Sequence, residues 1–301
     1  MDKGRVMVTG ASGFVGGHVV RLALPHGEVV GLARSPAPLQ HSNLVWAQVD
    51  LLNLAALERA FEEHPPSTVI HAAALSDIDA CERHQELAHD INVQATGHLV
   101  SLCRQFGSRL VFTSTDTVFS GTGRFYRETD TVEPVDYYGR TKVAAERLVL
   151  EPGYGFVVAR LCLVAGFAAF SRGNSFMVRA LASLRAEEPI TLATDEFRTP
   201  VFVEVAARAL LELAGNRLTG IYHLAGNNRL SRYEIGRKLA ILAGANPDLV
   251  KPRDSRSPVT GAARPKDVSL DNRKARSHLK TPFPDFDPAL LQLLATEVLP
   301  E

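Results

Sequence analysis

Short apolar segments alternate with helix-length segments over the first 165 residues of the chain. The apolar segments are continuous rather than alternating, which is typical of parallel strands buried on both faces. The expected strands are residues 5–9, 28–33, 44–48, 68–71, 109–113 and 155–163, and the expected helices are residues 14–24, 54–63, 87–106 and 137–150. This order predicts an α/β fold, a Rossmann-type doubly wound parallel sheet covered by helices.

The regular alternation weakens after residue 165. Helices are expected near residues 174–186, 203–214, 231–243 and 287–297, and short strands near 189–192 and 220–224. We interpret residues 1–165 as one Rossmann domain and residues 166–301 as a smaller C-terminal α/β lobe that binds the substrate. Segments near 200–225 are expected to return to the first domain.

Composition excludes several classes of protein. The 301 residues include 33 basic and 33 acidic side chains, so no overall charge attracts nucleic acid or an anionic membrane. No segment reaches the roughly 20 apolar residues that cross a bilayer. The three cysteines have neither zinc spacing nor a disulfide pattern, so no metal site is expected. These features predict a soluble, cytoplasmic protein.

A glycine-rich loop follows the first expected strand and opens the first expected helix. Gly10, Gly13 and Gly16 have the G-x-x-G-x-x-G spacing, which allows a tight turn and close approach of a pyrophosphate to the backbone. Free amides at the helix start then bind the anion. The predicted dinucleotide contacts in this loop are Gly10, Ser12, Gly13, Phe14, Val15 and Gly16.

The end of the second expected strand indicates which dinucleotide binds. An acidic residue there would bind the ribose hydroxyl of NAD(H), but residues 29–35 contain none. Arg34 and Ser35 can instead bind a 2′-phosphate, so NADP(H) is favoured and NAD(H) stays open. Asp50 and Leu51, after the third strand, are expected near the adenine. Residues 1–165 are therefore predicted to be the NADP(H)-binding domain.

A tyrosine and a lysine lie four residues apart at the start of an expected helix. This spacing puts Tyr138 and Lys142 on one helix face, where the ammonium is expected to lower the pKa of the phenol. Thr115 follows the fifth strand, at the end of the sheet where ligands of this fold bind. Together, these residues predict acid–base chemistry beside a nicotinamide cofactor.

The motifs taken together resemble the extended short-chain dehydrogenase/reductase superfamily. Residues 114–121, Tyr126-Arg127-Glu128 and Tyr138-Gly139-Arg140-Thr141-Lys142 are similar to the dTDP-4-dehydrorhamnose reductase group, as are residues 263–265 and 269–271. The resemblance implies a catalytic triad and further cofactor contacts. The triad is Thr115, Tyr138 and Lys142; the cofactor contacts are Tyr138, Lys142, Ala72, Ala73, Ala74 and Asn92.

The resemblance implies an NADP(H)-dependent reductase of a 4-keto nucleotide sugar. The same group includes the regulatory β subunit of methionine adenosyltransferase, which is a cofactor-binding protein rather than a reductase. A nucleotide-sugar epimerase or dehydratase is a further alternative, because Asp116 lies where a dehydratase has a base. Asp116, Arg198 and Arg264 are the expected substrate contacts, and a homodimer is the expected assembly.

Overall fold

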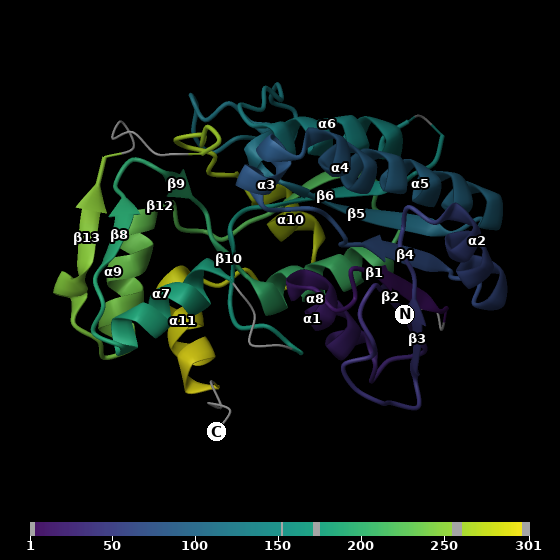
Figure 1. The fold of residues 1–301 in the computed structure, drawn as a ribbon, viewed down its shortest axis with the longest axis horizontal. Helices are drawn as coiled ribbons and strands as arrows, with labels where there is room; N and C mark the ends of the chain where they lie inside the picture. The colour runs from purple at the N-terminus through teal and green to yellow at the C-terminus, as the bar shows by residue number, and fades with distance from the viewer. Residues whose placement is uncertain (1–3, 152, 171–174, 255–260, 297–301) are drawn as a thin grey trace.

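A seven-stranded parallel sheet forms the centre of the computed structural model, which describes residues 4–151, 153–170, 175–254 and 261–296. The strands lie in the order β11-β6-β5-β4-β1-β2-β3 (Figure 1). Their bounds are β1 Val6–Thr9, β2 Val29–Ala33, β3 Leu44–Gln48, β4 Thr68–His71, β5 Arg109–Thr115, β6 Val157–Leu161 and β11 Gly220–Leu224. The predicted doubly wound α/β fold is confirmed. The order reverses beside β1, which creates a crevice at the carboxyl ends of β1 and β4.

Helices cover both faces of this sheet because neighbouring side chains of a strand point to opposite faces. Val8 packs in one core with α1 (Phe14–Ala23), α8 (Val203–Ala214) and α10 (Arg273–His278). Met7 packs in the other core with α2 (Leu54–Glu63), α5 (Ala95–Phe106) and α6 (Tyr137–Val149). The two cores fix the strand ends that carry the site.

A smaller lobe with its own apolar core lies beside the sheet (Figure 1). Its parallel strands β8 and β13 pair with each other. The main elements are α7 (Phe176–Arg185), β8 (Ile190–Ala193), α9 (Arg232–Leu242), β13 (Val250–Arg253) and α11 (Phe286–Ala295). Two short pairs of strands lie between this lobe and the sheet: β7 (Val164–Ala165) with β10 (Val201–Phe202), and β9 (Phe197–Arg198) with β12 (Leu230–Ser231).

The expected helix over 87–106 is present and begins two residues earlier, after the separate short helix α3 (Ile78–Arg83). It runs without a break through α4 (Gln85–His89), a π-helical turn over Asp90–Gln94 and α5. Asn92 lies within that turn, and its side chain exchanges two hydrogen bonds with the Leu75 backbone. A polar side chain drawn toward a loop in this way accompanies the wider turn. Among the described residues, no helix is both long and apolar enough to span a bilayer.

Candidate active site

The glycine loop lies against the end of a neighbouring strand. Gly10 has a φ of +64°, and a Cβ there would lie 2.8 Å from backbone atoms of Ala73. A Cβ at Gly16 would lie 2.1 Å from the Gly10 carbonyl oxygen. Any larger side chain at either position would therefore push the loop away from β4 or from α1. Gly13 is the N-cap of α1, so the free amides of that helix point toward the loop.

A cavity of about 390 Å³ opens at the carboxyl ends of the strands beside this loop. It brings together predicted cofactor contacts from four separate segments: Gly10, Ser12, Gly13, Arg34, Ser35, Asp50, Leu51, Ala72, Ala73 and Ala74. Phe14, Val15, Gly16, Asn92, Tyr138 and Lys142 are not among its lining residues. The rest of the wall is apolar, and no motif in the sequence marked these side chains: Leu32, Ala33, Val49, Leu52, Leu75, Leu87, Ile91 and Ala95. A larger cavity, of about 810 Å³, lies near the amino end of β11 and contains none of the predicted site residues.

The charges around the cavity favour a phosphate. Arg34 is exposed at the end of β2, and within the described residues its guanidinium has no partner. Glu28 lies at the other end of that strand, where its carboxylate pairs with Arg5 at 2.7 Å. The carboxylate nearest in sequence to β2 is therefore directed away from the cavity.

The hydroxyls of the predicted catalytic residues, Thr115 and Tyr138, come from β5 and from the first turn of α6. The carboxylate of Asp136 caps α6 by accepting the Gly139 amide at 2.7 Å, which fixes the start of the helix. Burial and the neighbouring Asp116 carboxylate raise the pKa of Tyr138, while hydrogen bonding with Thr115 acts in the opposite direction. Tyr138 is therefore protonated at neutral pH.

Lys142 is buried, with 1% of its surface exposed. Its Nζ lies 4.0 Å from the centre of the Phe112 ring. Burial lowers the pKa of Lys142 to about 7, and the nearby Glu146 carboxylate offsets part of that shift. The pKa of Tyr138 is raised rather than lowered, so the expected direction is wrong. Desolvation of the phenol dominates, because the lysine is itself desolvated and only partly charged at neutral pH.

A buried ion pair beneath α6 was missed by the sequence analysis. Arg160 on β6 donates to both oxygens of Glu146, over 2.9 and 2.7 Å. Ser114, next to Thr115, also donates to Glu146, and the other side of Arg160 lies 3.4 Å from His223 on β11. Glu146 lies four residues after Lys142, so helical spacing was a signal for its position. Arg160 is the only charged residue of the otherwise apolar strand β6, so its charge was the only sequence signal that it has a buried partner.

Asn92 and His71 connect the cofactor side to the catalytic helix. The amide nitrogen of Asn92 donates to the Leu75 carbonyl and to the Thr141 hydroxyl, each over 3.0 Å. His71 lies between the hydroxyls of Thr9 and Thr96, at 2.6 and 3.0 Å. Burial and nearby Lys142 lower the pKa of His71 to about 3, so its ring is neutral. Asn92 joins the Leu75 backbone to Thr141 of α6 without lining the cavity, and its role in cofactor binding stays a prediction.

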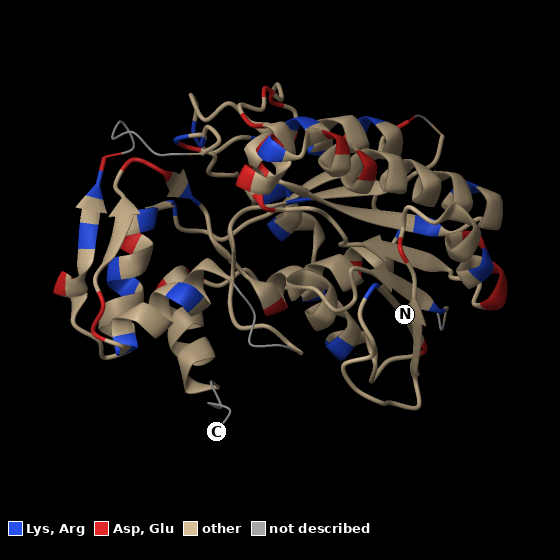
Figure 2. Cartoon of the chain, in the orientation of Figure 1, with Lys and Arg blue, Asp and Glu red and all other residues tan. Residues whose placement is uncertain are grey.

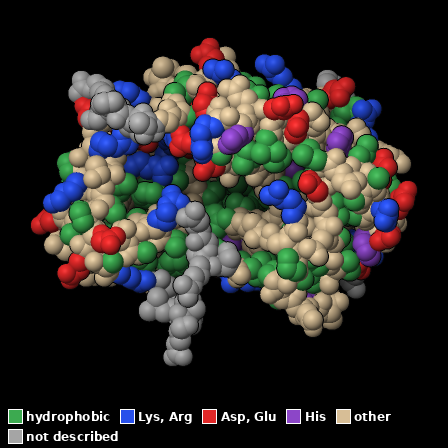
Figure 3. Space-filling model, viewed as in Figure 1, with side chains coloured by type: hydrophobic (Ala, Val, Ile, Leu, Met, Phe, Trp, Pro, Cys, Tyr) green, Lys and Arg blue, Asp and Glu red, His purple; other side chains and the backbone are tan. Residues whose placement is uncertain are grey.

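Each predicted substrate contact already has protein partners. Arg264 pairs with Asp79 at 2.8 Å, and Asp116 accepts from Thr115 and from Cys162. Arg198 is 4% exposed, and its guanidinium donates to three backbone carbonyls. The visible face of the molecule is hollowed between the two lobes, with Lys and Arg side chains among those on the small-lobe side (Figure 3). The ribbon positions of Lys and Arg along the chain are shown in Figure 2. The substrate roles of these three residues stay predictions.

Comparison with known proteins gives one consistent assignment. The sequence family described as RmlD substrate binding domain matches residues 4–298. A dTDP-4-dehydrorhamnose reductase of Streptomyces griseus is 30% identical over 297 residues, covering 96% of this chain and 92% of the relative. Methionine adenosyltransferase 2 subunit beta of Bos taurus is 28% identical over 273 residues, covering 89% and 80%.

A solved structure has the same fold over nearly the same length. The crystal structure of a hypothetical dTDP-4-dehydrorhamnose reductase from Sulfolobus tokodaii is 31% identical, with a TM-score of 0.83 and coverage of 95% of this chain and 98% of that one. The resemblance inferred from the motifs is thereby confirmed, and the chain belongs to the RmlD substrate binding domain family.

Proposed function

We propose that the protein is an NADPH-dependent reductase of a 4-keto nucleotide sugar. The observation that carries this proposal is that Thr115, the last residue of β5, and Tyr138, in the first turn of α6, lie toward the carboxyl end of the sheet, where the glycine loop also lies. The named activities of the Streptomyces griseus and Sulfolobus tokodaii relatives support the substrate class.

The cavity beside the glycine loop suits a dinucleotide phosphate. Gly10 and Gly16 allow the loop to pack tightly against Ala73 and α1, which keeps its amides beside the cavity for a pyrophosphate, and Arg34 on the cavity wall offers a cation for a 2′-phosphate. Gly10, Ser12 and Gly13 would hold the pyrophosphate, Arg34 and Ser35 the 2′-phosphate, and Asp50 and Leu51 the adenine. NADH is the alternative if Arg34 makes no such contact.

The residues of this chain have separable tasks in a carbonyl reduction. The bound nicotinamide supplies the hydride for the carbonyl carbon. Tyr138 donates its proton to the carbonyl oxygen, since its raised pKa keeps the phenol protonated until that oxygen becomes basic. The Thr115 hydroxyl has one proton, which points at Asp116 in the structure and would turn to the substrate carbonyl oxygen as negative charge develops there. Lys142, one helical turn from Tyr138, holds the cofactor ribose.

A panel of 4-keto nucleotide sugars tests this function. NADPH oxidation is followed by absorbance, and the reduced sugar is identified by mass spectrometry. A rate that depends on both the sugar and NADPH is expected. The absence of NADPH oxidation with the whole panel would contradict the proposal.

A regulatory role is the second candidate. It is favoured by the 28% identity to a methionine adenosyltransferase β subunit over 89% of this chain. Co-purification with a methionine adenosyltransferase catalytic subunit, without NADPH turnover, would support this role instead.

We also assign binding of the nucleotide sugar to the C-terminal lobe, residues 166–301. The separate apolar core of the small lobe supports the boundary near residue 165, and the roles of Arg198 and Arg264 rest on the resemblance. The homodimer is tested by light scattering, and the cytoplasmic location by fractionation of the source cells.

A further inference from the structure

A carboxylate directly follows the catalytic threonine in the chain. Asp116 comes after the last residue of β5 and is 4% exposed. Thr115 lies opposite Leu161 of β6, so Asp116 and Cys162 leave the sheet side by side. The Cys162 sulfur donates to Asp116 Oδ2 over 3.0 Å. Burial raises the pKa of Cys162 well above its ordinary value, so the thiol keeps its proton and can donate it.

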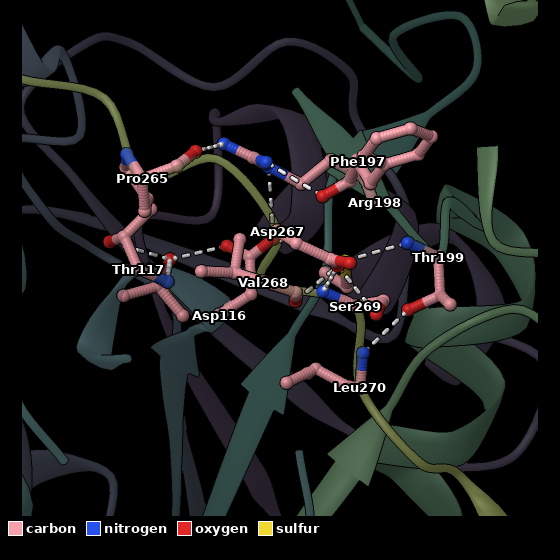
Figure 4. Close-up of polar contacts among 12 residues, drawn as sticks. Asp116, Thr117, Phe197, Arg198, Thr199, Pro265, Asp267, Val268, Ser269 and Leu270 are labelled. Atoms are coloured by element: carbon pink, nitrogen blue, oxygen red, sulfur yellow. Dashed lines mark hydrogen bonds and ion pairs between the residues drawn. The ribbon is translucent and has the colours of Figure 1, made fainter. Parts of the chain in front are cut away.

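Arg198 on β9, from the second half of the chain, contacts the same Asp116 carboxylate (Figure 4). The Nε of Arg198 lies 3.6 Å from Asp116 Oδ2. The other guanidinium nitrogens donate to the carbonyls of Phe197, Pro265 and Lys266, so the arginine is held from several directions. The next residue, Thr199, donates its amide to the Cys162 sulfur over 3.2 Å.

The second oxygen of Asp116 is directed at the catalytic threonine. The Thr115 hydroxyl donates to Oδ1 over 3.1 Å and accepts the Thr117 amide over 3.2 Å. These two contacts fix the side-chain rotamer of Thr115. Both carboxylate oxygens thus have protein donors, and with 4% of Asp116 exposed the carboxylate is directed at the protein rather than at an open site.

We propose that Asp116 is a positioning residue that holds the Thr115 hydroxyl in place, with its own orientation fixed by Cys162 and Arg198. The inference rests on the proposed reductase function. It replaces the expectations that Asp116 contacts the sugar or acts as the base of a dehydratase. A buried contact between β9 and the carboxyl end of β5 thereby couples the second half of the chain to the catalytic hydroxyl.

Two substitutions of one thiol test the contact. Cys162→Ala removes the donor and is expected to lower kcat for a 4-keto nucleotide sugar about tenfold, since a hydrogen bond to a charged group is lost. The KM for NADPH is expected to stay within about twofold. Cys162→Ser restores a donor and is expected to recover most of kcat. Cys103→Ala is the matched control, because it removes another buried thiol from α5, on the core side of the sheet; it lowers stability but not kcat.

Asp116→Asn separates positioning from proton transfer. Asp116, Cys81 and Asp136 are the ionisable groups that act on Tyr138, and all three raise the pKa of that phenol. Lys142 lies one helical turn further along α6. The substitution is expected to lower kcat about tenfold and to move the alkaline limb of the pH profile to lower pH. A loss of kcat far beyond tenfold, with the acidic limb of the pH profile absent from the residual rate, would assign Asp116 as a base and overturn the proposal.

The remaining outcomes are also decisive. Equal losses in Cys162→Ala and Cys162→Ser, or no loss in either, would overturn the inference while leaving the reductase function intact. A wild-type protein that oxidises NADPH with no sugar of the panel would overturn the reductase function, and this inference with it.

Discussion

At the scale of single residues, the proposed role of Tyr138 as proton donor depends on its raised pKa, which keeps the phenol protonated at neutral pH. Replacing Tyr138 with Phe keeps the ring and removes the proton donor, so NADPH affinity is expected to stay unchanged. Loss of general acid catalysis is expected to lower kcat about 10²- to 10⁴-fold. Steady-state kinetics and calorimetry on the same preparation measure both quantities. A normal rate would show that another group donates the proton.

Arg34 is the residue expected to choose the cofactor. One charge-assisted contact to a 2′-phosphate contributes about 1.5–3 kcal/mol, so NADPH is expected to bind at least tenfold tighter than NADH. Arg34→Ala should remove this preference and leave the Kd of NADH within about twofold. Calorimetric titration with both nucleotides is the measurement. Equal affinities in the unmodified protein would contradict the assignment.

Local spacing explains which site residues the sequence could predict. Gly10 and Gly13 lie in one loop, and Tyr138 and Lys142 lie on one helix, so their geometry follows from a few neighbouring residues. The contact of Asp116 with Arg198 depends on how two distant segments pack, and no local pattern reports that. The pKa of Tyr138 was predicted in the wrong direction, because spacing reveals a nearby lysine but not the burial of both groups.

At the scale of elements, α6 is held against β6 by a buried ion pair. Glu146 and Arg160 are 3% and 2% exposed, so removing one charge leaves the other without compensation. Arg160→Met is therefore expected to lower the free energy of unfolding by about 3–5 kcal/mol. Chemical denaturation monitored by circular dichroism measures the change.

The chain offers a matched control for that substitution. Arg5 and Glu28 form a pair that is partly exposed, with side chains 28% and 42% accessible. Arg5→Met should therefore cost less than about 1 kcal/mol. Similar losses in the free energy of unfolding for the two arginine substitutions would show that the buried pair stabilises the fold no more than the exposed pair.

Elements with strong periodicity were predicted nearly to the residue, as β3 and α8 show. The helix expected over 87–106 was predicted to within two residues, but periodicity does not reveal that Asn92 bonds to the Leu75 backbone inside a π-helical turn. The short strands β9 and β12 had no sequence signal. Two residues are too few for a period, and their pairing depends on the packing of the second half of the chain.

At the scale of the whole molecule, two buried histidines make stability depend on pH. Burial lowers the pKa of both His71 and His223 to about 3, from an ordinary value of 6.5. Between these values the unfolded chain binds protons that the folded chain does not. Their contribution is therefore fully present above pH 6.5 and is lost as the pH falls toward 3, by up to about 1.4 kcal/mol per pH unit for each histidine.

Thermal unfolding measured from pH 7 to pH 4 is expected to show this fall in stability. His71→Gln should reduce the slope, whereas the exposed His26 provides a control, because His26→Gln should leave the slope unchanged. A flat profile would mean that both rings accept protons within the fold.

The position of β11 also governs when the molecule can be completed during synthesis. β11 pairs with β6, and α8 covers one face of the same sheet, yet both are made after residue 200. A nascent chain that ends after β6 therefore exposes an unpaired strand edge and an uncovered apolar face. A fragment of residues 1–165 is expected to aggregate when expressed alone, as centrifugation of the lysate would show. The half that carries the glycine loop thus becomes a closed structure only after the ribosome has passed well into the other half.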